Sequence, residues 1–270
     1  MTSDKPEIYL DFLPYRDPYG MNQGNTLGKE DQISQNGTLF TIEYFICLML
    51  NLGKDHPVVL EEAERIKQVF KLIEIKDGLT VRFVGSNEFD SMDNYSAMLV
   101  FSTMYGNSEF AQRVRNHGLS TRADGIDETQ GSEINKKVYP LAFILNGFRK
   151  PRNFWNNCNP TKFCMFGWFG RSPGFMGLID ICATGKTSLF RSFSLWIGQM
   201  MYLFKSGNDC DGWKLAFNIW QLLKDRSWVW RKSYELWCKA LLKQHPDGMS
   251  GVFKEYGWGS HPIAKWSNKL

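Results

Sequence analysis

The chain has 270 residues, of which 43% are hydrophobic and 22% are charged. These proportions exclude a disordered protein, and the length is sufficient for one sizeable hydrophobic core. The 32 basic and 28 acidic residues leave a net charge of +4, a bias too weak to indicate a nucleic-acid partner by itself.

The first predicted element is an N-terminal arm that ends at about residue 35. Pro6, Pro14 and Pro18, followed by a run rich in glycine and asparagine, favour an extended arm or a surface loop. We expect this arm to belong to a single helical domain that covers residues 1–270, because no linker separates the two halves of the chain.

Two helices are predicted after the arm, at 38–51 and from Pro57 to Gly78. Proline is favoured in the first turn of a helix, and glycine commonly ends one. The second helix has an apolar stripe on one side, and its charged residues are expected to face outward on the other. The apolar positions are Val59, Ala63, Ile66, Phe70 and Ile73, and the outward positions are Glu61, Glu62, Glu64 and Lys67.

The rest of the chain is predicted to hold one short strand or extended connection at 79–84, followed by more helices. Residues 147–177 carry three prolines and several glycines, which predicts a long irregular loop. Each of the last two helices places two tryptophans seven residues apart, and therefore on one face. The helices are expected at 95–105, 108–116, 134–145, 186–205, 212–224 and 227–243.

An internal repeat links the starts of two apolar helices. Ser34–Thr38 and Ser91–Tyr95 are polar turns that lie 57 residues apart, and each precedes an apolar helix and then a more polar one. Repeated helical hairpins close either into a solenoid or into an α/α toroid. The sequence therefore predicts a mainly α fold built of helical hairpins, with both arrangements open.

No metal, cofactor or membrane-spanning segment is predicted. The six cysteines form no C-x-x-C pair, and no histidines accompany them at ligand spacing. Residues 1–6 lack the apolar segment of a secretory signal, and the apolar stretches at 40–52 and 193–204 are too short to cross a bilayer. We therefore expect a protein that is made and folded in a reducing compartment.

The polar turns at the helix starts have two interpretations. In the structural one, Asp90 or Ser91 caps a helix, and Asp93 lies in its first turn, where the helix dipole favours an anion. In the functional one, several helix starts share a rim around a polar depression, and the carboxylates of Glu43 and Asp93 perform glycosidic acid–base chemistry. The residues expected to bind a ligand there are Gln35, Asn36, Asn94 and Tyr95.

A second candidate surface lies in the predicted loop at 147–177, where cations alternate with aromatic residues. Arg152, Trp155, Trp168 and Arg171 are its expected contact residues. Such a surface can stack nucleic-acid bases, grip sugar rings or dock on another protein. The alternative is that the aromatic residues turn inward and cover the core.

Two further patterns argue against familiar chemistries. Residues 180–187 imitate a phosphate-binding loop, but Asp180 replaces its first glycine, and a carboxylate there repels phosphate. The four histidines belong to no recognisable catalytic motif, and His261 is expected to pack in a C-terminal turn. Nucleotide hydrolysis is therefore not expected.

Several groups of residues resemble uncharacterised proteins encoded by tailed bacteriophages. They are Gln35–Gly37 with Thr41–Tyr44, then Ser91–Tyr95, and finally Tyr256–Gly257 with His261–Pro262. The resemblance spans most of the chain and brings no known activity with it. It implies a phage context and a helical layout similar to that of α/α-toroid carbohydrate-active proteins.

We expect a phage-encoded structural or interaction protein of the virion or tail, which contacts other phage structural proteins through the loop at 147–175. The alternative is an α/α-toroid glycoside hydrolase or lyase, or a glycan-binding protein, with Glu43 and Asp93 as its paired carboxylates. A nucleic-acid-binding protein is the third hypothesis. In the phage context, the chain is made in the host cytoplasm and incorporated into the virion, without a cofactor.

Overall fold

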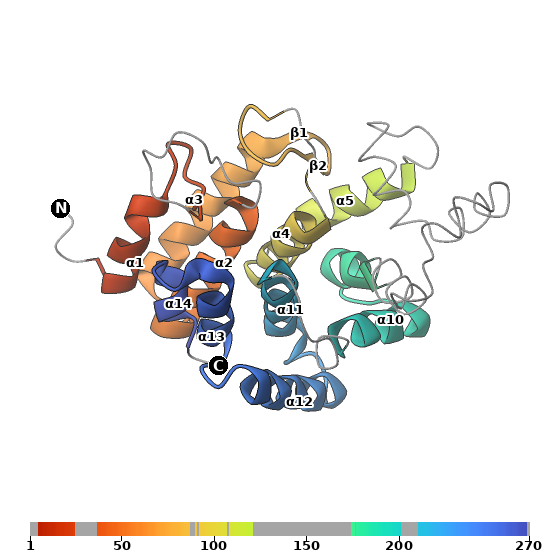
Figure 1. Ribbon diagram of the computed structural model, residues 1–270. Helices are drawn as coiled ribbons and strands as arrows, with labels where there is room; N and C mark the ends of the chain where they lie inside the picture. The colour runs from red at the N-terminus through yellow and green to blue at the C-terminus, as the bar shows by residue number, and fades with distance from the viewer. Residues whose placement is uncertain are drawn as a thin grey trace, which may run out of the picture. The chain divides into compact units, whose positions relative to one another are not determined.

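The computed structural model describes residues 5–24, 37–86, 90, 92–106, 108–120, 174–175, 177–200 and 210–268. This part of the chain is mainly helical, as predicted (Figure 1). The chain divides into two compact units, each described separately below. Unit 1 comprises Met1–Ile75, Thr80–Phe101 and Lys205–Leu270, and unit 2 comprises Lys76–Leu79 and Ser102–Phe204.

Helix α2 (Gly37–Leu52) forms the centre of unit 1. All its residues from Gly37 to Leu48 are buried, including the polar ones. It packs against α1 (Glu7–Phe12), α3 (Pro57–Ile73), α11 (Cys210–Leu223) and α14 (Pro262–Trp266), and Figure 1 shows these helices around it. A helix that is apolar on every side is stable only when other elements cover all of them.

Helix α3 confirms the predicted apolar stripe. Val59, Ala63 and Ile66 are buried, as are the other predicted apolar positions. The helix begins at Pro57 as expected, and His56 caps it by accepting a hydrogen bond at Nδ1 from the backbone N–H of Val58. One prediction is wrong: Glu62 does not face outward but is buried, because two arginine side chains bind its carboxylate there.

A short hairpin follows α3, where the sequence predicts that the helix continues to Gly78. Strands β1 (Glu74–Lys76) and β2 (Leu79–Thr80) pair with each other. The turn between them contains Gly78 at φ +74°, and a Cβ on that residue would lie 2.5 Å from the carbonyl carbon of Arg113. Only glycine fits a left-handed turn that lies so close to another backbone.

The N-terminal segment is not the extended arm that its prolines predict. Residues 7–15 form α1 and the 3-10 turn η1 (Leu13–Tyr15), and Ile8 and Phe12 are buried. The Phe12 ring lies 4.7 Å from the ring of Tyr44 on α2, measured between centroids. Pro6 precedes the first helical turn and Pro14 lies in the 3-10 turn, positions that tolerate proline. The burial of Phe12 in the core stabilises a helix too short to form alone.

The C-terminal helices of unit 1 pack around tryptophan residues, as predicted. Trp213 and Trp220 on α11 face α12 (Trp228–Gln244), with ring centroids 6.0 Å from Trp237 and 5.9 Å from Trp230, respectively. Ser227 caps α12 by accepting a hydrogen bond from the backbone N–H of Trp230. Helix α13 (Met249–Phe253) and the π-helical turn η4 (Lys254–Trp258) then lead to α14.

Helix α4 (Met92–Met104) runs from unit 1 into unit 2. In unit 1, Phe101 makes edge-on ring contacts with Phe45 and Phe70. Unit 2 contains α5 (Glu109–Ser120), a helical segment at 177–184 and α10 (Leu189–Met200). The helix predicted at 134–145 and most of the loop predicted at 147–177 lie outside the described residues. No helix in the described ranges is both long and apolar enough to cross a membrane.

Candidate functional site

Glu43, one of the two predicted catalytic residues, lies on α2 and faces Lys214 of α11. The two side chains are 2% and 1% exposed, and Lys214 Nζ lies 4.0 Å from Glu43 Oε2. Lys214 Nζ also lies 4.2 Å from the centre of the Phe40 ring, a cation–π contact. The attraction between two buried opposite charges offsets part of the free energy that is lost when both leave water. Glu43 is therefore held inside unit 1, away from its surface.

The interior around α11 is unusually polar. Lys214, Asn218 and Gln221 follow one another at helical spacing, and all three are buried. Neither amide atom of Asn218 has a hydrogen-bond partner among the described residues. Buried polar groups without partners are uncommon and lower the free energy of unfolding. These polar residues of α11 therefore make the core less stable than an apolar one would be.

His261 packs in the C-terminal turn, which confirms the prediction for this residue. Its Nδ1 accepts a hydrogen bond of 3.1 Å from the backbone N–H of Ile263, and its Nε2 lies 3.2 Å from the carbonyl oxygen of Gln23. Because Nδ1 accepts, the proton belongs on Nε2, which donates to Gln23. Burial, aided by the charge of Lys214, lowers the pKa of His261 to about 4. The neutral imidazole joins the N-terminal segment to α14.

The predicted binding residues Asn94 and Tyr95 lie buried at the start of α4. Asn94 Nδ2 donates a 2.7 Å hydrogen bond to Asp90 Oδ1, and the Tyr95 hydroxyl accepts a 2.9 Å bond from the backbone N–H of Thr80. Burial raises the pKa of Asp90 to about 7. These contacts tie the turn before α4 to strand β2.

The other predicted site residues fall outside the described part. The backbone of Asp93 lies in α4, but its side chain is not described, so no separation between its carboxylate and that of Glu43 follows. Gln35 and Asn36, just before α2, lie outside the described ranges. The contact residues of the predicted loop also lie outside them. Those are Arg152, Trp155, Trp168 and Arg171.

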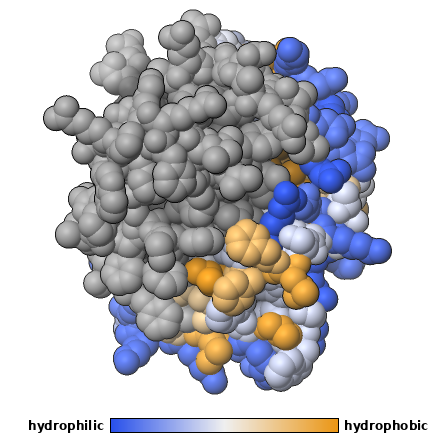
Figure 2. Space-filling model, turned by 90° about the vertical axis from the view of Figure 1, so that its right-hand side faces the viewer, coloured by the Kyte–Doolittle hydropathy of each residue, from blue (hydrophilic) through white to orange (hydrophobic). Residues whose placement is uncertain are grey.

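A different surface stands out in unit 2, on α10. Leu189 is 91% exposed and Phe193, one turn later, is 58% exposed; Phe190 beside them is also more than half exposed. We call Leu189, Phe190 and Phe193 the α10 stripe. Figure 2 faces the side of the molecule that bears α10 and shows hydrophobic side chains gathered together there. The buried residues of α10 are Ser194, Leu195 and Gln199, so the helix buries two polar side chains beside one leucine while three apolar ones are exposed.

Ion pairs hold α10 in this orientation. The Arg191 guanidinium binds Asp180 Oδ2, and Arg115 Nε of α5 lies 3.2 Å from Asp180 Oδ1. Gly177 also lies against α10, since a Cβ there would be 2.8 Å from the carbonyl oxygen of Arg191. Asp180, which departs from the phosphate-loop pattern, is thus a partner for two arginines. The exposure of the α10 stripe follows from contacts on the opposite side of the helix.

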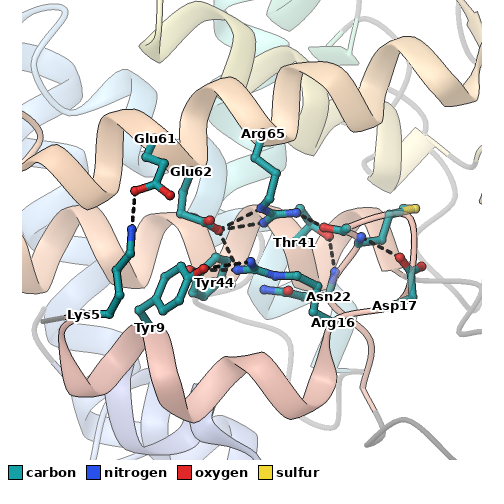
Figure 3. A network of polar contacts seen from close by, with 12 residues as sticks. Lys5, Tyr9, Arg16, Asp17, Asn22, Thr41, Tyr44, Glu61, Glu62 and Arg65 are labelled. Carbon is teal, nitrogen blue, oxygen red and sulfur yellow. Dashed lines mark hydrogen bonds and ion pairs between the residues drawn. The ribbon is translucent and has the colours of Figure 1, made fainter. Parts of the chain in front are cut away.

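A third polar group, in unit 1, fixes the N-terminal segment to α3 (Figure 3). Arg16 Nη2 lies 2.7 Å from Glu62 Oε2, and Arg65 Nη2 lies 2.8 Å from the same oxygen. Arg16 Nη2 also donates to the hydroxyl of Tyr44 at 3.3 Å. Its guanidinium lies over the ring of Tyr9, 5.1 Å from the centroid. Two arginines of the same chain bind one oxygen of the buried carboxylate, which makes this group a structural clamp.

Comparisons with known proteins add nothing to these observations. No family model, curated protein or solved structure matches the chain. In the described part, no group of three or more His, Cys, Asp or Glu side chains is arranged to hold a metal ion. The function therefore has to be inferred from the chain's own residues.

The exposure of the α10 stripe is a feature that the sequence does not reveal. The residue pattern predicts a helix over 186–205. It does not indicate which face of the helix packs against the rest of unit 2. Aromatic residues such as Phe190 and Phe193 would normally be expected in the core. The sequence does contain Arg191 within this helix and Asp180 before it. Their pairing determines which face of α10 is exposed.

Proposed function

We propose that this chain is an interaction protein that docks onto another protein through the α10 stripe, as a component of a phage virion or tail. The observation that carries the proposal is the exposure of Leu189, Phe190 and Phe193 on α10, a helix whose buried residues are Ser194, Leu195 and Gln199. The phage context rests on the sequence resemblance described above.

The energetics of exposed side chains support a docking surface. Burial of one large apolar side chain stabilises a protein or a complex by roughly 1.5–3 kcal/mol. Leu189 and Phe193 are left largely in water, so a partner that covers them gains this free energy at the moment of docking. Clustered exposed apolar residues mark interaction sites, whereas single ones do not.

The contacts of Glu43 favour the interaction protein over the glycan-processing enzyme. Glu43 is buried and paired with Lys214, and a general acid or base must come within hydrogen-bond reach of its substrate. The enzymatic alternative therefore needs an opening between α2 and α11 that exposes this pair.

Mass spectrometry of purified particles tests the proposal. We expect the chain in stoichiometric amounts in particles of the phage that encodes it. A Leu189→Ser/Phe193→Ser variant should be synthesised and folded but lost from the particles, because the docking surface is gone. Leu72→Ser is the matched control, since Leu72 is an exposed leucine on α3 of unit 1. Absence of the wild-type chain from the particles would show that the proposal is wrong.

A further inference from the structure

We infer that the exposed face of α12 binds an anionic lipid surface, with the helix lying flat in the headgroup layer. This face combines cations with large apolar side chains that are left in water. We call it the α12 face, and its members are Trp228, Lys232, Leu236, Lys239, Leu242 and Lys243. It belongs to unit 1, whereas the α10 stripe belongs to unit 2, so the inference goes beyond the proposed function.

The spacing of these residues gathers them on one side of α12. Trp228 is followed by Lys232, Leu236, Lys239 and Lys243 at intervals of four, four, three and four residues, which is the repeat of one helix face. The opposite side of the helix packs into unit 1 through the tryptophan contacts described above. The helix can therefore lie along a surface while the fold stays intact.

The apolar members of the α12 face are exposed to an unusual extent. Trp228 is 72% exposed, Leu236 is 54% exposed and Leu242 is 47% exposed. A helix face that only contacts water is typically charged or polar, so these side chains indicate a partner with an apolar component. Tryptophan is enriched at the boundary between lipid headgroups and hydrocarbon, where its ring is in an apolar layer and its N–H finds a polar partner.

The charge of the helix indicates the sign of the partner. Helix α12 contains four basic residues and one acidic residue, Glu235. Lys232 Nζ lies 2.7 Å from Glu235 Oε2, so this carboxylate already has a cation. Lys239 and Lys243 are exposed and form no ion pair with any described residue. The face therefore carries an excess of positive charge, which complements an anionic surface.

The position of the lysines within the face favours lipid over protein or nucleic acid. Lys232 lies between Trp228 and Leu236, and lysine is depleted in the core of protein interfaces. At a lipid surface, the stem of a lysine lies along the apolar layer while its ammonium extends to the headgroup phosphates. Single-stranded nucleic acid is bound by stacking of successive bases on aromatic rings, whereas the α12 face as defined above offers the ring of Trp228 alone.

Flotation of the purified full chain with lipid vesicles tests the inference. The protein should float with vesicles of equimolar phosphatidylglycerol and phosphatidylcholine, less so in high salt, and should not float with pure phosphatidylcholine. Lys239→Gln/Lys243→Gln should lower the partition coefficient about thirtyfold, because each lysine near an anionic surface contributes about a factor of five. Lys239→Arg/Lys243→Arg should bind as the wild type. Trp228→Ala should bind more weakly, because less apolar surface enters the headgroup layer.

Two control variants separate the α12 face from other surfaces. Lys71→Gln/Leu72→Ala changes an exposed cation and an exposed leucine on α3, and it should float as the wild type does. The α10 variant Leu189→Ser/Phe193→Ser should also float. Circular dichroism of each variant checks that the fold is intact.

Several results would overturn the inference. They are a wild-type protein that does not float, equal binding to both lipid compositions, and loss of flotation in the α10 variant in place of the α12 variants. Binding of the α12 lysines to double-stranded DNA or to polyglutamate, without vesicle binding, would also overturn it, because an acidic polymer would then be the partner.

Discussion

Lys214 and Glu43 are ionisable side chains that lie together in the core. The free-energy cost of burying either one therefore depends on the presence of the other. Truncation of one partner leaves an uncompensated buried charge, which costs about 3–5 kcal/mol. We therefore predict that Lys214→Met lowers the free energy of unfolding by about this amount, and that Glu43→Gln acts in the same direction. Urea denaturation measures both.

The double variant Lys214→Met/Glu43→Gln distinguishes a structural pair from a catalytic one. If the pair is structural, the double variant should recover much of the stability lost in either single variant, because no lone charge remains. A Glu43→Gln protein of unchanged stability that loses the ability to cleave a glycan would instead support the enzymatic alternative.

Two buried titratable residues in unit 1 have opposite effects on stability in acid. His261 has a pKa of about 4, below its ordinary 6.5. The unfolded chain therefore binds its proton first, and stability is lost as the pH falls from 6.5 to 4. Asp90 has a pKa of about 7, above its ordinary 3.8. Its contribution is present in acid and is lost as the pH rises through 7, so the two slopes oppose each other between pH 4 and 6.5.

Substitution of Asp90 should isolate the effect of His261 titration on the free energy of unfolding. Asp90→Asn keeps an oxygen that accepts from Asn94 Nδ2 but removes the titration. We predict that the free energy of unfolding of this variant falls by about 3 kcal/mol between pH 6.5 and 4, from the His261 shift alone. Urea denaturation at several pH values checks it. Wild-type and variant curves that run parallel would contradict the assignment.

The N-terminal segment shows how an element can depend on one distant residue. Its prolines predict an extended arm, and the charges on α3 predict an outward Glu62. Both predictions fail because of contacts between residues far apart in the sequence: Phe12 is buried against Tyr44 of α2, and Arg16 reaches Glu62 from 46 positions away. Local periodicity contains no information about such a contact. By contrast, α2, α3, α11 and α12 follow from their own apolar spacing and caps, and the sequence is sufficient to place them.

Removal of this contact should release the segment selectively. We predict that Arg16→Ala exposes α1 and η1 to limited proteolysis and speeds amide hydrogen exchange in residues 7–15, because the carboxylate of Glu62 loses one of its two cations. Lys5→Ala is the control, since the Lys5–Glu61 pair lies at the surface, where ion pairs contribute about 1 kcal/mol or less. Equal effects of the two substitutions would refute the role assigned to Arg16.

The aromatic contacts between α11 and α12 allow a second test, of how much a buried tryptophan contributes to stability. Trp237 is completely buried against Trp213, whereas Trp228 at the start of the same helix is 72% exposed. We predict that Trp237→Ala lowers the free energy of unfolding by about 3–5 kcal/mol through the cavity it leaves. Trp228→Ala should change it by about 0.5 kcal/mol or less. Thermal denaturation of the two variants compares them. Similar losses of stability in both would argue against this packing.

The two units of the molecule divide its properties between them. Unit 1 contains the Glu43–Lys214 pair, the Glu62 group and the tryptophan contacts of α11 and α12, of which the sequence predicts only the last. Unit 2 carries the α10 stripe, whose exposure depends on the pairing of Arg191 with Asp180 and is not visible in the residue pattern. The closure of the helical hairpins into a toroid and the virion role stay predictions, while the mainly α class is confirmed.

Photo-crosslinking from the α10 stripe tests most directly whether it is a docking surface. A benzophenone amino acid replaces Phe193 in one protein and Leu72 in another, both exposed positions. In purified particles, illumination should link position 193 to one defined protein, identified by mass spectrometry of the linked peptides, and should give no defined product from position 72. Equal, diffuse labelling from both positions would contradict a docking role for α10.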